Sequence, residues 1–201
     1  MKFHPSRWQV YGFSEISPEK SVTLDEFFRC EPELFRTGCY QLFLQVKNNI
    51  TVQVGALGNL AFSPGMVVYT GRHQRSLPGR IRRHAGQKAK NYWHIDYLTS
   101  SPDFSLENII LYPRTAEECI LHQSFQAWSH SLYLHSRFGN GDCTGGCDSH
   151  LLYLNHSRKT LMSLFGKWMR KTADRKPVLL SRKGNSDLIF NKELEYDVLF
   201  Y

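Results

Sequence analysis

The chain has 201 residues, 41% of them apolar and 13% aromatic, which is enough to bury a core and excludes a disordered tail. No apolar run approaches the ~20 residues that span a bilayer, and the N-terminus has no apolar signal-peptide core, so we expect an intracellular, cytoplasmic protein with no membrane partner. The formal net charge is +7, and the odd number of cysteines, five, favours thiols or metal ligands over a disulfide framework.

The chain is predicted to comprise three parts. Residues 1–36 form an N-terminal arm, whose aromatic side chains predict that it packs against the rest of the protein. Residues 37–154 form the central domain, and residues 155–201 form a basic C-terminal extension. Apolar residues at helical spacing predict an amphipathic helix in the first half of this extension.

Three strands and a helix are predicted in the first half of the central domain. Side chains alternate along residues 38–46 with the period of a strand. A turn that contains two asparagines leads to a returning strand at residues 50–54, and residues 66–70 form a third strand. A short helix follows, with Ser76 as its N-cap and Pro78 in its first turn.

The remaining elements complete a mixed α/β, or α+β, domain. Residues 108–112 are predicted to form a strand, and residues 115 to about 131 are predicted to form a helix. A glycine-rich loop then leads into a last strand. We expect a small, largely antiparallel core sheet of three strands, flanked by helices.

Positive charge is concentrated in one segment of the chain. From Leu34 to Ile95 there is no acidic residue but nine Lys or Arg residues, whereas the rest of the chain has 16 basic and 18 acidic residues. A segment this one-sided repels itself unless it meets a polyanion, which favours a phosphate-bearing partner over a solvated basic surface. The side chains predicted to bind nucleic acid are Arg72, Arg75, Arg82, Arg83, Lys88 and Lys90.

Two short motifs and one helix resemble the GIY-YIG nuclease superfamily. Gly38-Cys39-Tyr40 lies on the first strand, Tyr69-Thr70-Gly71 on the third, and Arg80 and His84 lie four apart on the helix that follows. The superfamily pattern is GIY, YIG, an arginine on the next helix and a glutamate on a later one. The likeness covers about residues 37–154 and is strongest to a little-characterised archaeal and bacterial branch. The further features shared with that branch are the WHIDYL segment at 93–98, Glu118-Cys119, and Asp142-Cys143 through Cys147 to Ser149-His150-Leu151.

This resemblance implies a GIY-YIG-like fold and hydrolysis of DNA phosphodiester bonds with one divalent ion, Mg²⁺ or Mn²⁺, held by Glu118. Arg80 would contact the scissile phosphate, and Tyr40 and Tyr69 would orient or deprotonate the attacking water. His84 would be the general base or would position the nucleophile, because imidazole titrates near neutral pH. Relatives fused to a base-excision-repair glycosylase imply a role in DNA repair or processing.

Two other functions remain open from the sequence. The chain could be a nucleic-acid-binding module that does no chemistry, or a nuclease that acts on RNA. It also departs from the family pattern at Thr70 and at Arg72-His73, where close relatives have small residues. The two large side chains could contact phosphate or obstruct the site.

Several site residues have a structural interpretation as well. Glu118 also fits a capping box with Thr115, and helical spacing does not separate it from Glu117 as the metal ligand. If residues 92–98 form a strand, His94 and Asp96 project from one face. Such a pair could support the site by orienting a base or binding phosphate, or it could be a structural polar pair.

A second metal site is considered and not favoured. Cys143, Cys147 and His150 are three potential Zn²⁺ ligands. The candidates for a fourth are Cys119, Asp142 and His135. Structural zinc sites usually have four ligands at recognisable spacing, so a glycine-rich turn with buried thiols is the preferred interpretation.

Overall fold

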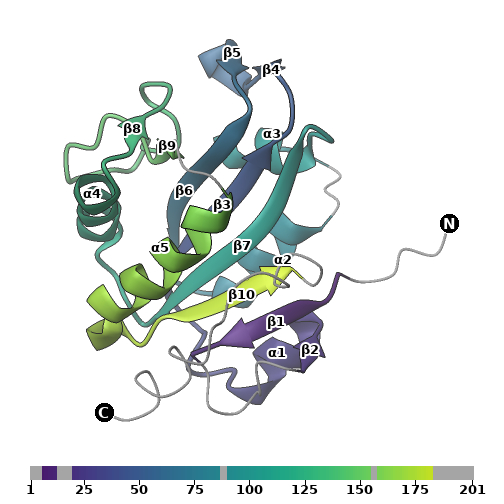
Figure 1. Ribbon diagram of the computed structural model, residues 1–201, viewed down its shortest axis with the longest axis vertical. Coiled ribbons are helices and arrows are strands. Elements are labelled where there is room, and N and C mark those ends of the chain that lie inside the picture. The colour runs from purple at the N-terminus through teal and green to yellow at the C-terminus, as the bar shows by residue number, and fades with distance from the viewer. Residues whose placement is uncertain (1–5, 13–19, 87–89, 155–157, 183–201) are drawn as a thin grey trace, which may run out of the picture.

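A computed structural model describes residues 6–12, 20–86, 90–154 and 158–182, and these form one large sheet with helices on both faces (Figure 1). In chain order the elements are β1 (Trp8–Tyr11), β2 (Ser21–Val22), α1 (Leu24–Cys30), β3 (Gly38–Val46), β4 (Ile50–Gln53), β5 (Asn59–Phe62), β6 (Gly65–His73), α2 (Leu77–Ala85), α3 (His94–Ser100), β7 (Phe104–Pro113), α4 (Glu118–Ser129), β8 (Leu132–Tyr133), β9 (Leu151–Leu154), α5 (Arg158–Lys171) and β10 (Val178–Arg182). Short 3₁₀ helices lie at Gly55–Leu57 and Ala173–Arg175.

The main sheet has eight strands in the order β2-β1-β10-β7-β3-β6-β9-β8, and every neighbouring pair is antiparallel. The mixed, largely antiparallel fold is therefore confirmed, but the prediction of three strands is wrong. The additional edge next to β7 is built from β1, β2 and β10, which come from the two ends of the described chain. Pairings between such distant segments leave no local signal in the sequence.

Both faces of the sheet are buried. Alternate residues of the central strand β3 point to opposite faces, and they join two different core clusters. Leu42 and Leu44 belong to one core cluster together with Leu77 of α2 and Leu98 of α3. Phe43 belongs to a second cluster with side chains of α4 and α5, and its ring lies 4.5 Å from that of Phe165. In Figure 1, α5 crosses the sheet on the face opposite α2 and α3.

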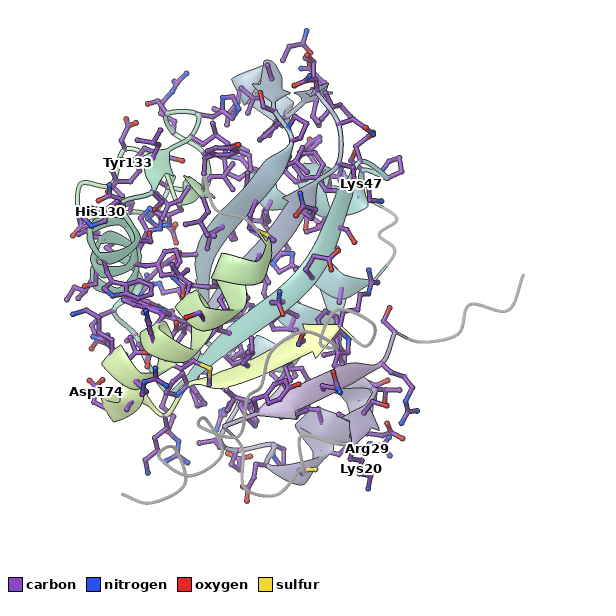
Figure 2. All side chains as sticks on the ribbon, viewed as in Figure 1. Lys20, Arg29, Lys47, His130, Tyr133 and Asp174 are labelled. Carbon is purple, nitrogen blue, oxygen red and sulfur yellow. The ribbon has the colours of Figure 1, made fainter. Side chains whose placement is uncertain are left out.

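The N-terminal elements share the core of the central strands. Trp8, Phe27 and Phe28 are buried in the same cluster as Leu42. The labelled side chains of Lys20, Arg29, Lys47 and Asp174 lie at the periphery of the molecule (Figure 2). Within the described ranges, none of the helices combines the length and the apolar character needed to cross a bilayer.

Two local predictions in the first half of the central domain have different outcomes. Helix α2 begins as predicted, with Pro78 in its first turn and with the Gly79 N–H donating to Ser76 Oγ at 3.2 Å. The strand at 50–54 does not return along β3, because β4 pairs with β5 in a separate two-stranded sheet. The partner of β3 on that side is β6, which covers it over its whole length from Gly38 to Val46.

Residues 92–98 do not form the strand considered for them, since this segment contains helix α3. Trp93, Ile95 and Tyr97 alternate as they would in a strand. The buried apolar residues, however, are Ile95 and Leu98, which are three apart, as on one face of a helix. The Asp96 side chain caps the N-terminus of the helix, because its Oδ2 accepts the N–H of the N-cap residue, Trp93, at 3.2 Å. A short polar cap, which the alternation of apolar residues does not reveal, therefore starts a helix in this segment.

Candidate functional site

A pocket of about 300 Å³ lies beside β3, β6 and the start of α4. It gathers Tyr40, Tyr69, Arg80 and Glu118, which the sequence placed in one site, and adds an aromatic wall. The lining residues are Tyr40, Tyr69, Arg72, Arg80, Tyr92, Trp93, His94, Glu118, Gly139, Gly141 and Asp142. The pocket thus combines two carboxylates, two guanidinium groups and three phenols.

The two tyrosines lie on adjacent strands of the sheet. Tyr40 on β3 is paired with Gly71 on β6, and the ring centroids of Tyr40 and Tyr69 are 6.3 Å apart. A Cβ atom on Gly71 would lie 2.5 Å from the Tyr40 hydroxyl, so only glycine leaves room for that ring. Burial raises the pKa of both tyrosines well above the ordinary value. Both phenols are therefore neutral hydrogen-bonding groups at neutral pH.

A chain of three buried side chains leads away from the pocket. The Tyr40 hydroxyl lies 3.0 Å from His84 Nε2, and His84 Nδ1 lies 3.4 Å from Asp96 Oδ1, at the long end for a hydrogen bond. With an Nδ1–H directed at Asp96, the Nε2 lone pair of His84 accepts the Tyr40 O–H. His84 and Asp96 are buried and do not line the pocket, so they act on it through Tyr40.

Asp96 is held as a carboxylate by its neighbours. Burial alone would raise its pKa, but hydrogen bonds from His84, from Arg83 and from the backbone N–H groups of Tyr92 and Trp93 outweigh burial. The resulting pKa lies well below the ordinary range. The shortest of these contacts joins Arg83 Nη2 to Asp96 Oδ2 at 2.7 Å. The negative charge that orients His84 is therefore permanent at neutral pH.

His94 and Asp96 do not form a pair, because side chains two residues apart on helix α3 point in different directions. His94 lines the pocket, where its Nδ1 accepts the Gly139 N–H at 3.0 Å. Burial lowers the pKa of His94, which favours the neutral imidazole. With Nδ1 acting as the acceptor, the proton of this ring is carried by Nε2.

Arg80 differs from the neighbouring arginines. Its guanidinium carbon lies 3.5 Å from the centroid of the Trp93 ring, and its buried Nε has no hydrogen-bond partner among the described residues. No carboxylate in the described part of the chain pairs with it. A positively charged, planar group is thus held at the pocket wall by stacking and not by an opposite charge.

The other predicted nucleic-acid-binding residues fall into two groups. Arg72, Arg82 and Arg83 are each paired with a carboxylate, and these acids come from outside the acid-free segment: Glu118 (3.4 Å), Asp25 (2.5 Å) and Asp96 (2.7 Å). Arg75 and Lys90 are exposed, whereas Lys88 lies outside the described residues. Part of the charge that suggested a polyanion is therefore neutralised within the fold.

Glu118 faces the pocket and does not cap its helix. Helix α4 begins at Glu118, and its N-cap, Glu117, makes no side-chain capping bond, so the capping-box interpretation with Thr115 is wrong. Glu118 Oε1 lies 3.0 Å from His150 Nδ1, and Oε2 lies 3.4 Å from Arg72 Nε. Glu117 is exposed and is not part of this pocket. The structure therefore distinguishes two carboxylates that the sequence could not.

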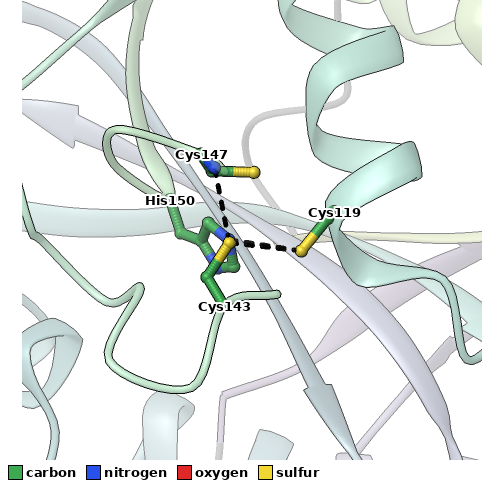
Figure 3. Close-up of side chains that lie close together, drawn as sticks. All are labelled: Cys119, Cys143, Cys147 and His150. Atoms are coloured by element: carbon green, nitrogen blue, oxygen red, sulfur yellow. Dashed lines mark hydrogen bonds between the residues drawn. The ribbon is translucent and has the colours of Figure 1, made fainter. Parts of the chain in front are cut away.

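Four of the candidate zinc ligands lie close together (Figure 3). The ligand atoms of Cys119, Cys143, Cys147 and His150 all lie within 4.8 Å of one another, and the cluster could hold a metal ion. Cys119 is thus the fourth member. The other two candidates have different surroundings, since Asp142 lines the pocket and His135 Nε2 lies 2.9 Å from the Ala61 carbonyl.

The thiols of this cluster do not ionise alike. Burial would raise the pKa of Cys143, but the Cys147 backbone N–H and the Cys119 and His150 side chains lower it to about 6. The pKa of Cys119 is raised by burial and by the bond to Cys143, and burial also raises the pKa of Cys147. One thiolate therefore forms readily, and its negative charge opposes ionisation of its neighbours.

A family model described as "Domain of unknown function DUF123" matches residues 39–172, about two thirds of the chain. The chain belongs to this family. No curated protein and no solved structure matches it. The DUF123 region begins in β3 and ends just after α5, and it contains every residue of the pocket and of the Cys/His cluster.

Sequence reasoning missed the aromatic wall of the DUF123 pocket. Tyr92 and Trp93 are 65% and 40% exposed, which is unusual for side chains this large. The guanidinium carbon of Arg83 lies 4.9 Å from the Tyr92 ring centroid, and Lys90 Nζ lies 5.5 Å from it. The signal in the sequence that could have identified this wall was the adjacent aromatic pair Tyr92-Trp93 inside the basic segment.

Proposed function

We propose that the chain is a divalent-metal-dependent endonuclease that hydrolyses phosphodiester bonds in DNA, in DNA repair or processing. The observation that carries this proposal is Arg80, which stacks on Trp93 in the pocket wall without a carboxylate partner among the described residues. A guanidinium group matches two oxygens of a phosphate with parallel N–H donors. An unneutralised guanidinium beside phenols and a carboxylate is suited to an anionic substrate.

The residues behind Tyr40 support hydrolysis, because they provide a route for the proton of the attacking water. The Tyr40 oxygen would accept that proton while its own proton passes to His84 Nε2, 3.0 Å away. Asp96 would stabilise the imidazolium that forms. Since burial raises the pKa of Tyr40, this relay avoids a free tyrosinate. The neighbouring Tyr69 hydroxyl would orient the water or a phosphate oxygen.

Glu118 fits a bound Mg²⁺ or Mn²⁺, because these ions prefer oxygen ligands and retain several waters. Asp142 lines the same pocket and offers a second carboxylate. When bound, such an ion would neutralise charge on the phosphoryl oxygens and acidify a coordinated water. Arg72, 3.4 Å from Glu118, would shift toward the substrate phosphate or share the carboxylate with the ion.

The aromatic wall supports a nucleic-acid substrate. Exposed rings can stack on unpaired bases, and nearby cations can follow the backbone. Tyr92 and Trp93 offer such rings, with Arg83 and Lys90 beside them. This combination favours DNA with an unpaired or distorted segment near the cleavage point.

The resemblance to GIY-YIG nucleases agrees with this assignment. The two tripeptide motifs lie on adjacent antiparallel strands, with Tyr40 and Tyr69 on the same face. Arg80 lies on the next helix and Glu118 begins a later one. The order of the motifs in the sequence thus corresponds to side chains that share one pocket.

The test is incubation of the full chain with plain, nicked, flapped and branched DNA, and with matching RNA, in Mg²⁺ or Mn²⁺. The test variant is Arg80→Ala. The matched control is Arg36→Ala, whose side chain is 71% exposed and lies outside the pocket. We expect cleavage of at least one DNA structure, a loss of ~10²–10³-fold for Arg80→Ala, and wild-type rates for the control.

Three results would contradict the proposal. Binding without cleavage of any substrate would leave a non-catalytic nucleic-acid-binding module. Cleavage confined to RNA would replace DNA as the substrate. Cleavage that Arg80→Ala leaves unchanged would move the chemistry away from this pocket.

A further inference from the structure

The proposed hydrolysis uses none of the five cysteines, yet three of them converge on one histidine. Cys119 comes from the first turn of α4, Cys143 and Cys147 from one loop, and His150 from the residue before β9. The two remaining cysteines lie apart, with Cys30 exposed on α1 and Cys39 buried on β3. A chance grouping would not be expected to bring four metal-ligating atoms together from three segments.

The spacing of these atoms fits a tetrahedral centre. Zinc binds thiolates at ~2.3 Å, so the ligand atoms of a tetrahedral site lie ~3.8 Å apart. Cys119 Sγ lies 3.4 Å from Cys143 Sγ and 4.0 Å from His150 Nε2. All four ligand atoms lie within 4.8 Å of one another. The sulfur–sulfur separation is too long for a disulfide bond, which measures ~2.0 Å.

The loop from Cys143 to Cys147 is shaped to hold its sulfurs in place. The Cys147 N–H donates to Cys143 Sγ at 3.4 Å, and Gln123 Nε2 donates to Cys147 Sγ at 3.6 Å and to the Gly145 carbonyl at 2.8 Å. A Cβ atom on Gly145 would lie 2.5 Å from Cys119 Cβ, so only glycine allows this close approach. The loop thus closes over Cys119 instead of leaving it open to solvent.

We propose that Cys119, Cys143, Cys147 and His150 bind one zinc ion as a closed, structural centre. Three sulfurs and an imidazole nitrogen are ligands that favour zinc over Mg²⁺ or Mn²⁺. Four protein ligands leave no open position for water or substrate, so the ion has no catalytic role of its own. This centre is separate from the divalent ion proposed at Glu118 and does not depend on nuclease activity.

Glu118 connects the zinc centre to the pocket. His150 donates its Nδ1–H to Glu118 Oε1 at 3.0 Å, which leaves the Nε2 lone pair directed at the cysteines. Metal-binding histidines commonly donate their other N–H to a carboxylate in this way. The zinc-bound imidazole would therefore fix the orientation of Glu118. This last step, unlike the zinc site itself, rests on the proposed function of the pocket.

The test measures metal in the full chain without any nucleic acid. The protein is purified with a reductant and no chelator, incubated with Zn²⁺, freed of excess ion and analysed for metal content. We expect about one zinc per chain in the wild type and in the matched control Cys30→Ser, and a loss of at least about tenfold in zinc affinity for Cys143→Ser. Cobalt(II) in place of zinc is expected to give the absorption of tetrahedral thiolate ligation.

The measurements on the wild type keep the test decisive even if Cys143→Ser does not fold. A folded wild-type chain that retains no zinc after loading would overturn the proposal, as would equal zinc loss in Cys143→Ser and Cys30→Ser. A Cys119–Cys143 disulfide in protein that was purified with a reductant and loaded with zinc would overturn it too. A zinc-bound chain that cleaves nothing contradicts only the nuclease, whereas a cleaving chain without zinc contradicts only this centre.

Discussion

The pocket and the Cys/His cluster both border Glu118 and are built differently. In the pocket, polar groups face an open space of about 300 Å³, and Arg80 has no carboxylate partner among the described residues. In the cluster, the ligand atoms face one another within 4.8 Å and a backbone N–H already contacts one sulfur. Polar groups that face an open pocket suit an anionic substrate that binds and leaves. Ligand atoms that face one another suit a metal ion that stays bound.

Replacing the residue that the two regions share should have the largest effect. We expect Glu118→Gln to lower single-turnover cleavage by ~10³-fold, because the amide is a poor Mg²⁺ ligand. Zinc content should stay near that of the wild type, since the glutamine carbonyl can still accept the His150 Nδ1–H. Loss of both properties would show that the two regions form a single metal centre.

Tyr40→Phe should affect the pocket alone. The substitution removes only the hydroxyl that contacts His84 Nε2, so we expect a ~10²-fold lower cleavage rate with unchanged DNA affinity and zinc content. Tyr69→Phe is the matched comparison, and it should cost less because the hydroxyl that lies 3.0 Å from His84 Nε2 belongs to Tyr40. Equal losses in single-turnover rate for the two variants would contradict the relay through His84.

The pocket was more predictable from the sequence than the cluster. Tyr40 lies on a strand with alternating side chains, Tyr69 lies at the end of a short apolar run, and Arg80 lies one turn into a helix with a recognisable Ser76 cap. Local periodicity therefore aims these side chains toward one side of the sheet. The fourth ligand of the cluster, Cys119, lies 24 residues from Cys143, and only the fold brings them together.

The errors in the fold arose from contacts that the pattern of apolar residues does not report. β10 pairs with both β1 and β7, and these pairings add β10, β1 and β2 to the other five strands of the eight-stranded sheet. The segment at 92–98 was assigned by its alternation, while the backbone bonds to Asp96 that make it a helix involve only single atoms. Patterns of apolar residues report which face is buried, but they do not identify the strand neighbours or the helix cap.

Asp96→Asn tests whether the charge behind the pocket matters for both chemistry and stability. We expect about a tenfold to hundredfold lower cleavage rate, because the imidazole loses its orienting carboxylate. Breaking the buried contact with Arg83 should also cost ~3 kcal/mol of unfolding free energy at pH 7. Zinc content should not change, since Asp96 does not contact the cluster.

The stability effect of Asp96 should depend on pH in a defined direction. Its folded-state pKa is depressed below the unfolded value of ~3.9, so its contribution is complete above that value and is lost as the pH falls below it. Urea unfolding should therefore give wild-type and Asp96→Asn free energies that converge below about pH 4. A difference that stays constant through this range would indicate that packing, and not charge, sets the cost.

Trp93→Ala tests the aromatic wall. Loss of the ring removes the support of Arg80 and one stacking surface, so we expect about tenfold weaker binding of flapped DNA. The measurement is fluorescence anisotropy in a Glu118→Gln background, which prevents cleavage. Leu132→Ala, an exposed apolar residue on β8 outside the pocket, is the control and should bind normally. Equal affinities for both variants would exclude a contact between this wall and DNA.

The smallest expected effect compares a paired with an unpaired cation. Lys90 is exposed and has no carboxylate partner among the described residues, whereas Arg82 lies 2.5 Å from Asp25. Lys90→Ala should reduce the slope of log affinity against log salt by ~1, because one phosphate contact is lost. Arg82→Ala should leave the slope nearly unchanged, because its charge is already neutralised. If both variants change the slope equally, carboxylate pairing does not determine which cations meet DNA, and the assignment of Arg80 on that criterion loses its basis.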